Sequence, residues 1–158
     1  MATLPELIET YLAGPPALRA AVAGMTREQL VARPVAGKWS TLEVVAHLAD
    51  YEPILADRVK RTLAFPKPLL FGADPDAMVA AGAYHDRDLD EELQLIEATR
   101  KSLARVLRTL DVSALARPCV HTERGLLTLE QVLTLAGRHV AHHLPFIAAK
   151  RAALGVLA

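Results

Sequence analysis

Two helix-capping motifs constrain the fold of this chain more than any other feature. They are Ser40-x-x-Glu43 and Thr128-x-x-Gln131. In each, the hydroxyl can accept from the backbone N–H three residues on, and the longer side chain can reach back to the first N–H. Apolar residues with helical spacing follow both motifs. The motifs therefore predict two long helices, at residues 40–63 and 128–154.

Two further segments have the apolar spacing of a helix. The first covers residues 4–23 and contains Gly14-Pro15-Pro16, so we expect a kink or two short helices there. The second begins near Asp88 or Asp90, with acidic residues in its first turn, and ends at Leu110. Four long helical segments with no clear strand predict an all-α four-helix bundle, formed by a single domain over residues 1–158.

The remaining segments are predicted to be connections. Proline and glycine interrupt residues 65–76, and a short helix is expected at 76–82. Residues 114–125 are expected to form a loop in which His121 is solvated, unless it or His85 lines the mouth of a pocket. The connection over 64–87 is long enough to cross the bundle, so the topology need not be simple up-down-up-down.

Composition excludes several classes of protein. The chain has 18 basic and 18 acidic residues with no basic stripe, which argues against nucleic-acid binding. No apolar run approaches the ~20 residues of a membrane span, and the beginning does not resemble a secretory signal. The single cysteine, Cys119, cannot form an internal disulfide, which suits a reducing compartment. We therefore expect a cytoplasmic protein without membrane or nucleic-acid partners.

Three of the six histidines could meet around one metal ion. His139 and His143 are four residues apart, which places them on one helix face with Cβ atoms about 5–6 Å apart. His47 lies on another predicted helix and could supply a third ring from a facing position. A neutral imidazole offers one nitrogen to a metal, and three protein ligands leave coordination positions open, as in catalytic sites. Such a pair is, however, more often a surface feature or a satisfied core group.

The residues around these histidines resemble the DinB-like superfamily, which includes proteins proposed to be metal-dependent thiol transferases. Two stretches carry the resemblance, GKWSTLEVVAHLADYE at 37–52 and GLLTLEQVLTLAGRHVAHHLPFI at 125–147. The resemblance covers almost the whole chain. It implies an up-down-down-up bundle, a divalent metal bound by His47, His139 and His143, and a homodimer. His142, three residues after His139, is then near the metal ligands or solvent-facing.

Four residues are candidates for the surroundings of the metal. Asp50 lies one turn from His47 and could accept from its second ring nitrogen. Tyr51 could reach a metal-bound water, although a core tyrosine is the more common case. Phe146 occupies a position where the resembled family often has Gln, and the phenylalanine ring would make the pocket wall apolar. His142 completes the set.

Other residues have simpler interpretations. Trp39 is expected to be a packing anchor, and Cys119 lacks a histidine at helical spacing that would make it a ligand. His85, in a predicted loop, is expected to be solvated. Four cationic residues are expected on the solvent-exposed face of the third long helix: Arg100, Lys101, Arg105 and Arg108.

These features favour a metal-dependent enzyme that transfers a thiol to an electrophilic small molecule. Because the chain has no well-placed cysteine, the thiol would come from a cosubstrate. In the resembled family that is a low-molecular-weight thiol such as bacillithiol or mycothiol. Two alternatives remain: a metal-dependent hydrolase, and a non-enzymatic metal- or ligand-binding protein associated with stress. Imidazole ligands suit Zn, Ni and Fe alike, so the sequence leaves the metal open.

Overall fold

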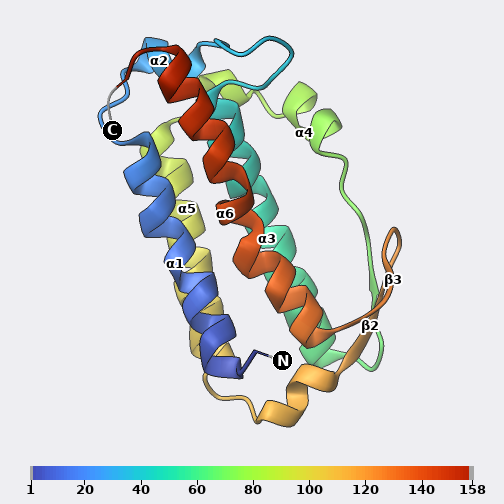
Figure 1. The fold of residues 1–158 in the computed structure, drawn as a ribbon. Coiled ribbons are helices and arrows are strands. Elements are labelled where there is room, and N and C mark those ends of the chain that lie inside the picture. Colours follow the sequence, from blue (N-terminus) through green and yellow to red (C-terminus); the bar gives the residue numbers. More distant parts are fainter. Residues whose placement is uncertain (1, 157–158) are drawn as a thin grey trace.

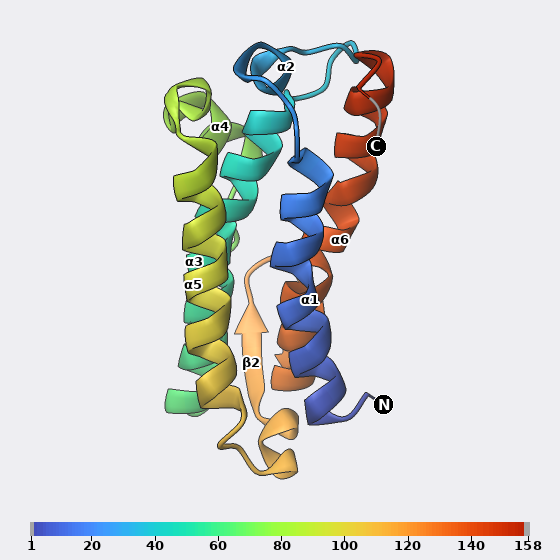
Figure 2. The ribbon, with the colours of Figure 1, turned by 90° about the vertical axis from the view of Figure 1, so that its left-hand side faces the viewer.

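The computed structural model describes residues 2–156 and consists mainly of four long helices lying side by side (Figures 1 and 2). Helices α1 and α6 rise from the bottom to the top of Figure 1, whereas α3 and α5 descend. The order is therefore up-down-down-up, as the resemblance implied. The bounds of the four helices are α1 (Leu4–Val22), α3 (Thr41–Ala64), α5 (Leu89–Leu107) and α6 (Leu129–Ala153).

Each helix packs against two others, α1 and α3 both contacting α5 and α6. The parallel pair α3 and α5 is possible because the connection between them returns along the bundle (Figure 1). That connection contains the short strand β1 (Leu69–Leu70), helix α4 (Pro75–Ala81) and the 3₁₀ turn η1 (Tyr84–Asp86). Helix α2 (Arg27–Val31) joins α1 to α3. No helix within residues 2–156 is both long and apolar enough to cross a membrane.

The predicted capping motifs are present at the starts of α3 and α6. Ser40 Oγ accepts from Glu43 N at 3.1 Å, and the Glu43 carboxylate accepts from Ser40 N at 2.6 Å. Thr128 and Gln131 make the same reciprocal pair at the start of α6. Each cap satisfies backbone N–H groups that a helix start leaves without partners, and it contributes about 1 kcal/mol.

The expectation of no strands is wrong. A small sheet has the order β1-β2-β3, in which β2 (Pro118–His121) pairs in parallel with β1 and in antiparallel with β3 (Gly125–Thr128). Strand β3 begins directly after the turn with Gly125 at φ 72°, a conformation that favours glycine. The hairpin lies beside the bundle near the start of α6 (Figure 1). Strands this short have no readable periodicity, and β1 pairs only because the fold brings it beside β2.

The expectation of two short helices within residues 4–23 is wrong, since α1 is one continuous helix through Pro15 and Pro16. A proline has no N–H, so Pro15 leaves the carbonyl of Tyr11 without its helical donor. The guanidinium of Arg100 donates to that carbonyl at 2.5 Å instead. Gly14 makes room for this contact, because a Cβ there would collide with the Arg100 guanidinium.

The expectation that Arg100 lies on the solvent face is therefore wrong, although Lys101, Arg105 and Arg108 are exposed. The Arg100 guanidinium binds the Glu52 carboxylate at 2.8 Å and donates to the Ala136 carbonyl at 3.2 Å. Tyr11 Oη donates to the other oxygen of Glu52 at 2.5 Å. This network joins all four long helices, and it holds α3 against α6 within two turns of the histidines.

Candidate metal centre

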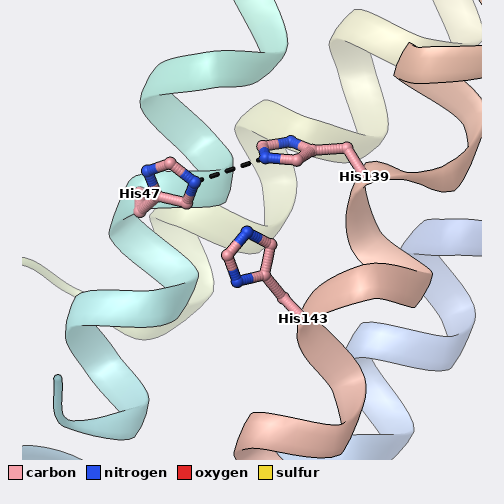
Figure 3. Close-up of side chains that lie close together, drawn as sticks. All are labelled: His47, His139 and His143. Atoms are coloured by element: carbon pink, nitrogen blue, oxygen red, sulfur yellow. Dashed lines mark hydrogen bonds between the residues drawn. The ribbon is translucent and has the colours of Figure 1, made fainter. Parts of the chain in front are cut away.

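The three histidines converge between α3 and α6 (Figure 3). One ring nitrogen from each of His47, His139 and His143 lies within 4.8 Å of the others. The Nε2 atoms of His47 and His139 are 3.3 Å apart. Two nitrogens bound tetrahedrally at a zinc–nitrogen distance of about 2.0–2.1 Å are about 3.4 Å apart, so this pair already has the separation that a metal requires. We call the three residues the histidine triad.

Helix packing explains why these rings meet. His139 and His143 leave the same face of α6, one turn apart, and that face packs on α3. His47 is buried, and the other two rings are half-buried. The His47 ring also lies against Trp39 and Tyr51, with centroids 5.2 and 4.5 Å apart, so aromatic packing sets its orientation.

Burial keeps the triad neutral. Desolvation lowers the pKa of His47 to about 4, with a smaller opposing effect from Asp50. It lowers the pKa of His139 to about 3 and that of His143 to about 4, and in both cases neighbouring histidines add to the effect. At neutral pH each ring therefore has a nitrogen lone pair, which is the donor set that imidazole-binding metals need. The residues present fit a divalent ion.

Asp50 and Glu52 do not contact the triad rings through hydrogen bonds in the described part of the chain. Asp50 pairs with Arg87 at 2.6 Å and accepts from the Tyr84 hydroxyl at 2.8 Å. The other ring nitrogens of His47 and His139, both Nδ1, are buried without a hydrogen-bond partner among residues 2–156. The expectation that Asp50 accepts from His47 is therefore wrong, because Arg87 and Tyr84 bind its carboxylate instead.

Tyr51 and His142 occupy different positions around the triad. The Tyr51 ring packs 5.4 Å from that of His139, and its hydroxyl donates to the Ala73 carbonyl in the connection after β1. The His142 side chain is exposed, with its ring 5.1 Å from that of His143. The triad is thus formed by His143 of this adjacent pair, and His142 stays on the solvent side.

Two cavities each have a triad histidine in their wall. The His143 cavity has a volume of about 380 Å³ and is lined largely by apolar groups, with Trp39, Val44 and Phe146 among them. The His139 cavity has a volume of about 160 Å³ and includes Tyr51, Arg58 and His121. Phe146 is 44% exposed, so it forms the rim of the His143 cavity as well as its wall.

Two residues of these surroundings differ from what the sequence indicated. His121 is buried, not solvated, because β2 directs it inward, where its Nδ1 accepts from Glu123 N at 3.2 Å. No sequence signal identifies it, since it depends on the sheet. Half-buried His85 faces Ser40 Oγ at 3.1 Å instead of lying free in solvent. Cys119 is buried in the core and is not a member of the triad, as expected.

Comparisons with known proteins place the chain in a family. A family model described as the DinB superfamily matches residues 11–147. A protein of Bacillus subtilis named "Putative metal-dependent hydrolase YfiT" is 30% identical over 134 residues, which is 84% of this chain and 75% of that protein. A protein of Oceanobacillus iheyensis, also named "Putative metal-dependent hydrolase", is 27% identical over 84% of this chain and 77% of its own length.

Solved structures show the same fold. The structure of YfiT from Bacillus subtilis, described as a probable metal-dependent hydrolase with an unusual four-helix bundle topology, superposes with a TM-score of 0.89 at 27% identity. It covers 96% of this chain and 87% of that one. A mycothiol-dependent maleylpyruvate isomerase superposes with a TM-score of 0.70 at 14% identity, covering 92% of this chain and 62% of that one. At this identity the likeness concerns the fold alone.

Proposed function

The chain belongs to the DinB superfamily, and on that premise we propose that it is a metal-dependent enzyme whose metal is held by the histidine triad. The observation that carries the proposal is the convergence of three neutral ring nitrogens within 4.8 Å, beside two cavities. The names of the relatives from Bacillus subtilis and Oceanobacillus iheyensis support a metal-dependent activity.

A divalent ion bound by three neutral imidazoles keeps its charge and lowers the pKa of a thiol or water that it binds. The contribution of the chain is to position and shield the reactants. Trp39 and Phe146 line the His143 cavity and give one side of the triad an apolar wall. Tyr51 packs on the rings of His47 and His139 and limits access from the other side.

We further propose that the nucleophile is a low-molecular-weight thiol. The two carboxylates within five residues after His47 on α3 are in ion pairs, Asp50 with Arg87 and Glu52 with Arg100. They are therefore poor bases for a water nucleophile. A thiol depends less on such a base, because its pKa is about 8.5 against about 15.7 for water. Two cavities beside one triad also give separate space to two reactants.

The proposed reaction forms one sulfur–carbon bond. The thiol gives up its proton to solvent, and its sulfur attacks an electrophilic carbon with an electron pair. The leaving group departs with the pair from the bond that breaks, so the reaction needs no oxidant or reductant. Hydrolysis is the second candidate, and the names of the relatives favour it. Binding without catalysis is the non-enzymatic alternative.

The test compares His139→Ala with His142→Ala, two changes on the same helix. Protein purified without a histidine tag is analysed for bound metal and for conjugation of bacillithiol or mycothiol to 1-chloro-2,4-dinitrobenzene. We expect the wild type and His142→Ala to bind one metal and to conjugate, because the exposed His142 lies outside the triad. His139→Ala should lose both while keeping its helical content.

Each other result selects an alternative. Equal conjugation rates in the wild type and in metal-free His139→Ala would contradict the metal-dependent proposal. Metal binding with ester hydrolysis but without conjugation would favour the hydrolase. If the protein bound metal but catalysed neither reaction with any substrate of a panel, the non-enzymatic binding protein would be the remaining alternative.

A further inference from the structure

Lys150 is a buried cation in the wall of the His143 cavity. Its side chain is 3% exposed, and its ammonium donates to the Phe146 carbonyl on the same helix at 3.0 Å. Among the described residues the ammonium forms no ion pair with a carboxylate, and the Phe146 carbonyl is its hydrogen-bond partner. Lysine is rarely buried without a paired anion, because loss of hydration disfavours the charged form. The cavity wall therefore contains an amine whose charged form has no carboxylate partner among the described residues.

Glu43 is the acidic residue whose charge acts on Lys150, and its carboxylate is already bound by other groups. Glu43 accepts from Arg33 Nε at 3.0 Å and from Ser40 N at 2.6 Å. Burial lowers the pKa of Lys150, the Glu43 charge raises it, and Lys38 lowers it further. Asp76 also lines the cavity, but it lies in the exposed first turn of α4. An anion bound beside Lys150 would offset the cost of burying its charge, which Glu43 does not offset by direct pairing.

The remainder of the cavity is suited to an apolar body. Its walls include Val35, Trp39, Val44, Phe146 and Ala149. A volume of about 380 Å³ lies within the range of small-molecule sites, which are mostly apolar with a few placed polar groups. One buried ammonium in such surroundings is the kind of polar group that fixes the orientation of a ligand.

The position of Lys150 links this charge to the triad. It follows His143 by seven residues, or about two helical turns, so both side chains leave the same face of α6 about 10 Å apart along the axis. The ammonium reaches back to the carbonyl of Phe146, which shortens the separation from the His143 ring. A molecule with its charged end at Lys150 can therefore place atoms several bonds away beside the triad.

We propose that the His143 cavity binds a small molecule that carries one carboxylate on an apolar body, with the carboxylate paired to the Lys150 ammonium. Two of the three ammonium hydrogens remain for the two carboxylate oxygens after the bond to Phe146. A dianionic phosphate would need more donors than this single buried cation supplies. The binding of such a molecule does not depend on the proposed function. Only its identification as the electrophilic substrate rests on that function.

Trp39 supplies the readout, because it lines the cavity and is the single tryptophan of the chain. Its fluorescence is titrated with cyclohexanecarboxylate, cyclohexanecarboxamide and cyclohexyl phosphate, which do not absorb where tryptophan is excited. The metal-free wild type should bind the carboxylate at least about tenfold more tightly than the amide, the size of effect that a charge-assisted hydrogen bond produces. Equal affinities would overturn the proposal, and tighter binding of the phosphate would overturn the carboxylate class. This comparison requires no variant.

The variants Lys150→Met and Lys38→Met locate the charge. Lys150→Met keeps an unbranched apolar side chain and should abolish the preference for carboxylate over amide, whereas exposed Lys38→Met should keep most of it. The opposite pattern would overturn the assignment to Lys150. Because the titration is done without metal and without a reaction, it can succeed even if the proposed thiol transfer fails.

Discussion

Arg100→Met should destabilise the protein strongly, although Arg100 contacts no triad residue through a hydrogen bond in residues 2–156. The change leaves the Glu52 carboxylate, 1% exposed, with only the Tyr11 hydroxyl as a partner. It also removes the donors to the carbonyls of Tyr11 and Ala136. Of these two, the Tyr11 carbonyl cannot recover a helical donor, because Pro15 occupies the position that would supply it.

The expected loss is about 3–5 kcal/mol, since breaking a buried ion pair strands an uncompensated charge. That is a large fraction of the ~5–15 kcal/mol that stabilises a typical domain. For a chain of this size it corresponds to a fall of roughly 6–20 °C in melting temperature. Urea unfolding followed by circular dichroism measures the free energy, with the m-value checked for constancy.

Two further variants make the test specific. Lys101→Met changes an exposed cation on the same helix and should cost less than about 0.5 kcal/mol. Adding Glu52→Gln to Arg100→Met removes the stranded charge and should restore part of the loss, as a double-mutant cycle would record. If Arg100→Met cost less than about 1 kcal/mol, the conclusion that this network holds the four helices together would be refuted.

Three other predictions concern pH, metal and assembly. Arg33 and the Ser40 N–H hold the pKa of Glu43 at about 2, below the ordinary 4.5, against the opposing effect of burial. Ionised Glu43 therefore stabilises the fold above pH 4.5, and this contribution is lost as pH falls towards 2. At pH 7, Glu43→Gln should lower the free energy of unfolding by about 2–3 kcal/mol. The difference between this variant and the wild type should vanish on acidification. Added Zn, Ni or Fe should raise the melting temperature of the wild type in proportion to the logarithm of the metal concentration, because metal binds only the folded triad. The melting temperature of His139→Ala should not change. The wild type treated with a chelator should still have the circular dichroism spectrum of a helical protein. The homodimer implied by the family resemblance should appear in sedimentation equilibrium, and a monomer at high micromolar concentration would contradict it.

Local sequence signals were sufficient for the positions of the four long helical segments and for two of the three triad residues. The capping motifs at Ser40 and Thr128 begin α3 and α6 as predicted, because a cap depends on residues within one turn of each other. The pairing of His139 with His143 follows from helical geometry in the same way. The four helical segments predicted the bundle, whereas the family resemblance implied its up-down-down-up order, and both agree with the structure.

Tertiary structure decided everything that needed two distant segments. His47 joins the other two histidines only because α3 packs antiparallel on α6, and His121 is buried only because β1, β2 and β3 associate. Asp50 lies one helical turn after His47, but its carboxylate pairs with Arg87, which lies in the connection between α3 and α5.

Arg100 shows the physical reason for this division most clearly. On its own helix it looks like one more solvated cation, because helical spacing says which residues share a face but not what that face meets. Its burial depends on Glu52, on Gly14, and on a carbonyl that Pro15 left without a donor, each on a different turn or helix. Short-range hydrogen bonds can thus be inferred from neighbouring letters, whereas desolvation and charge pairing are properties of the packed bundle.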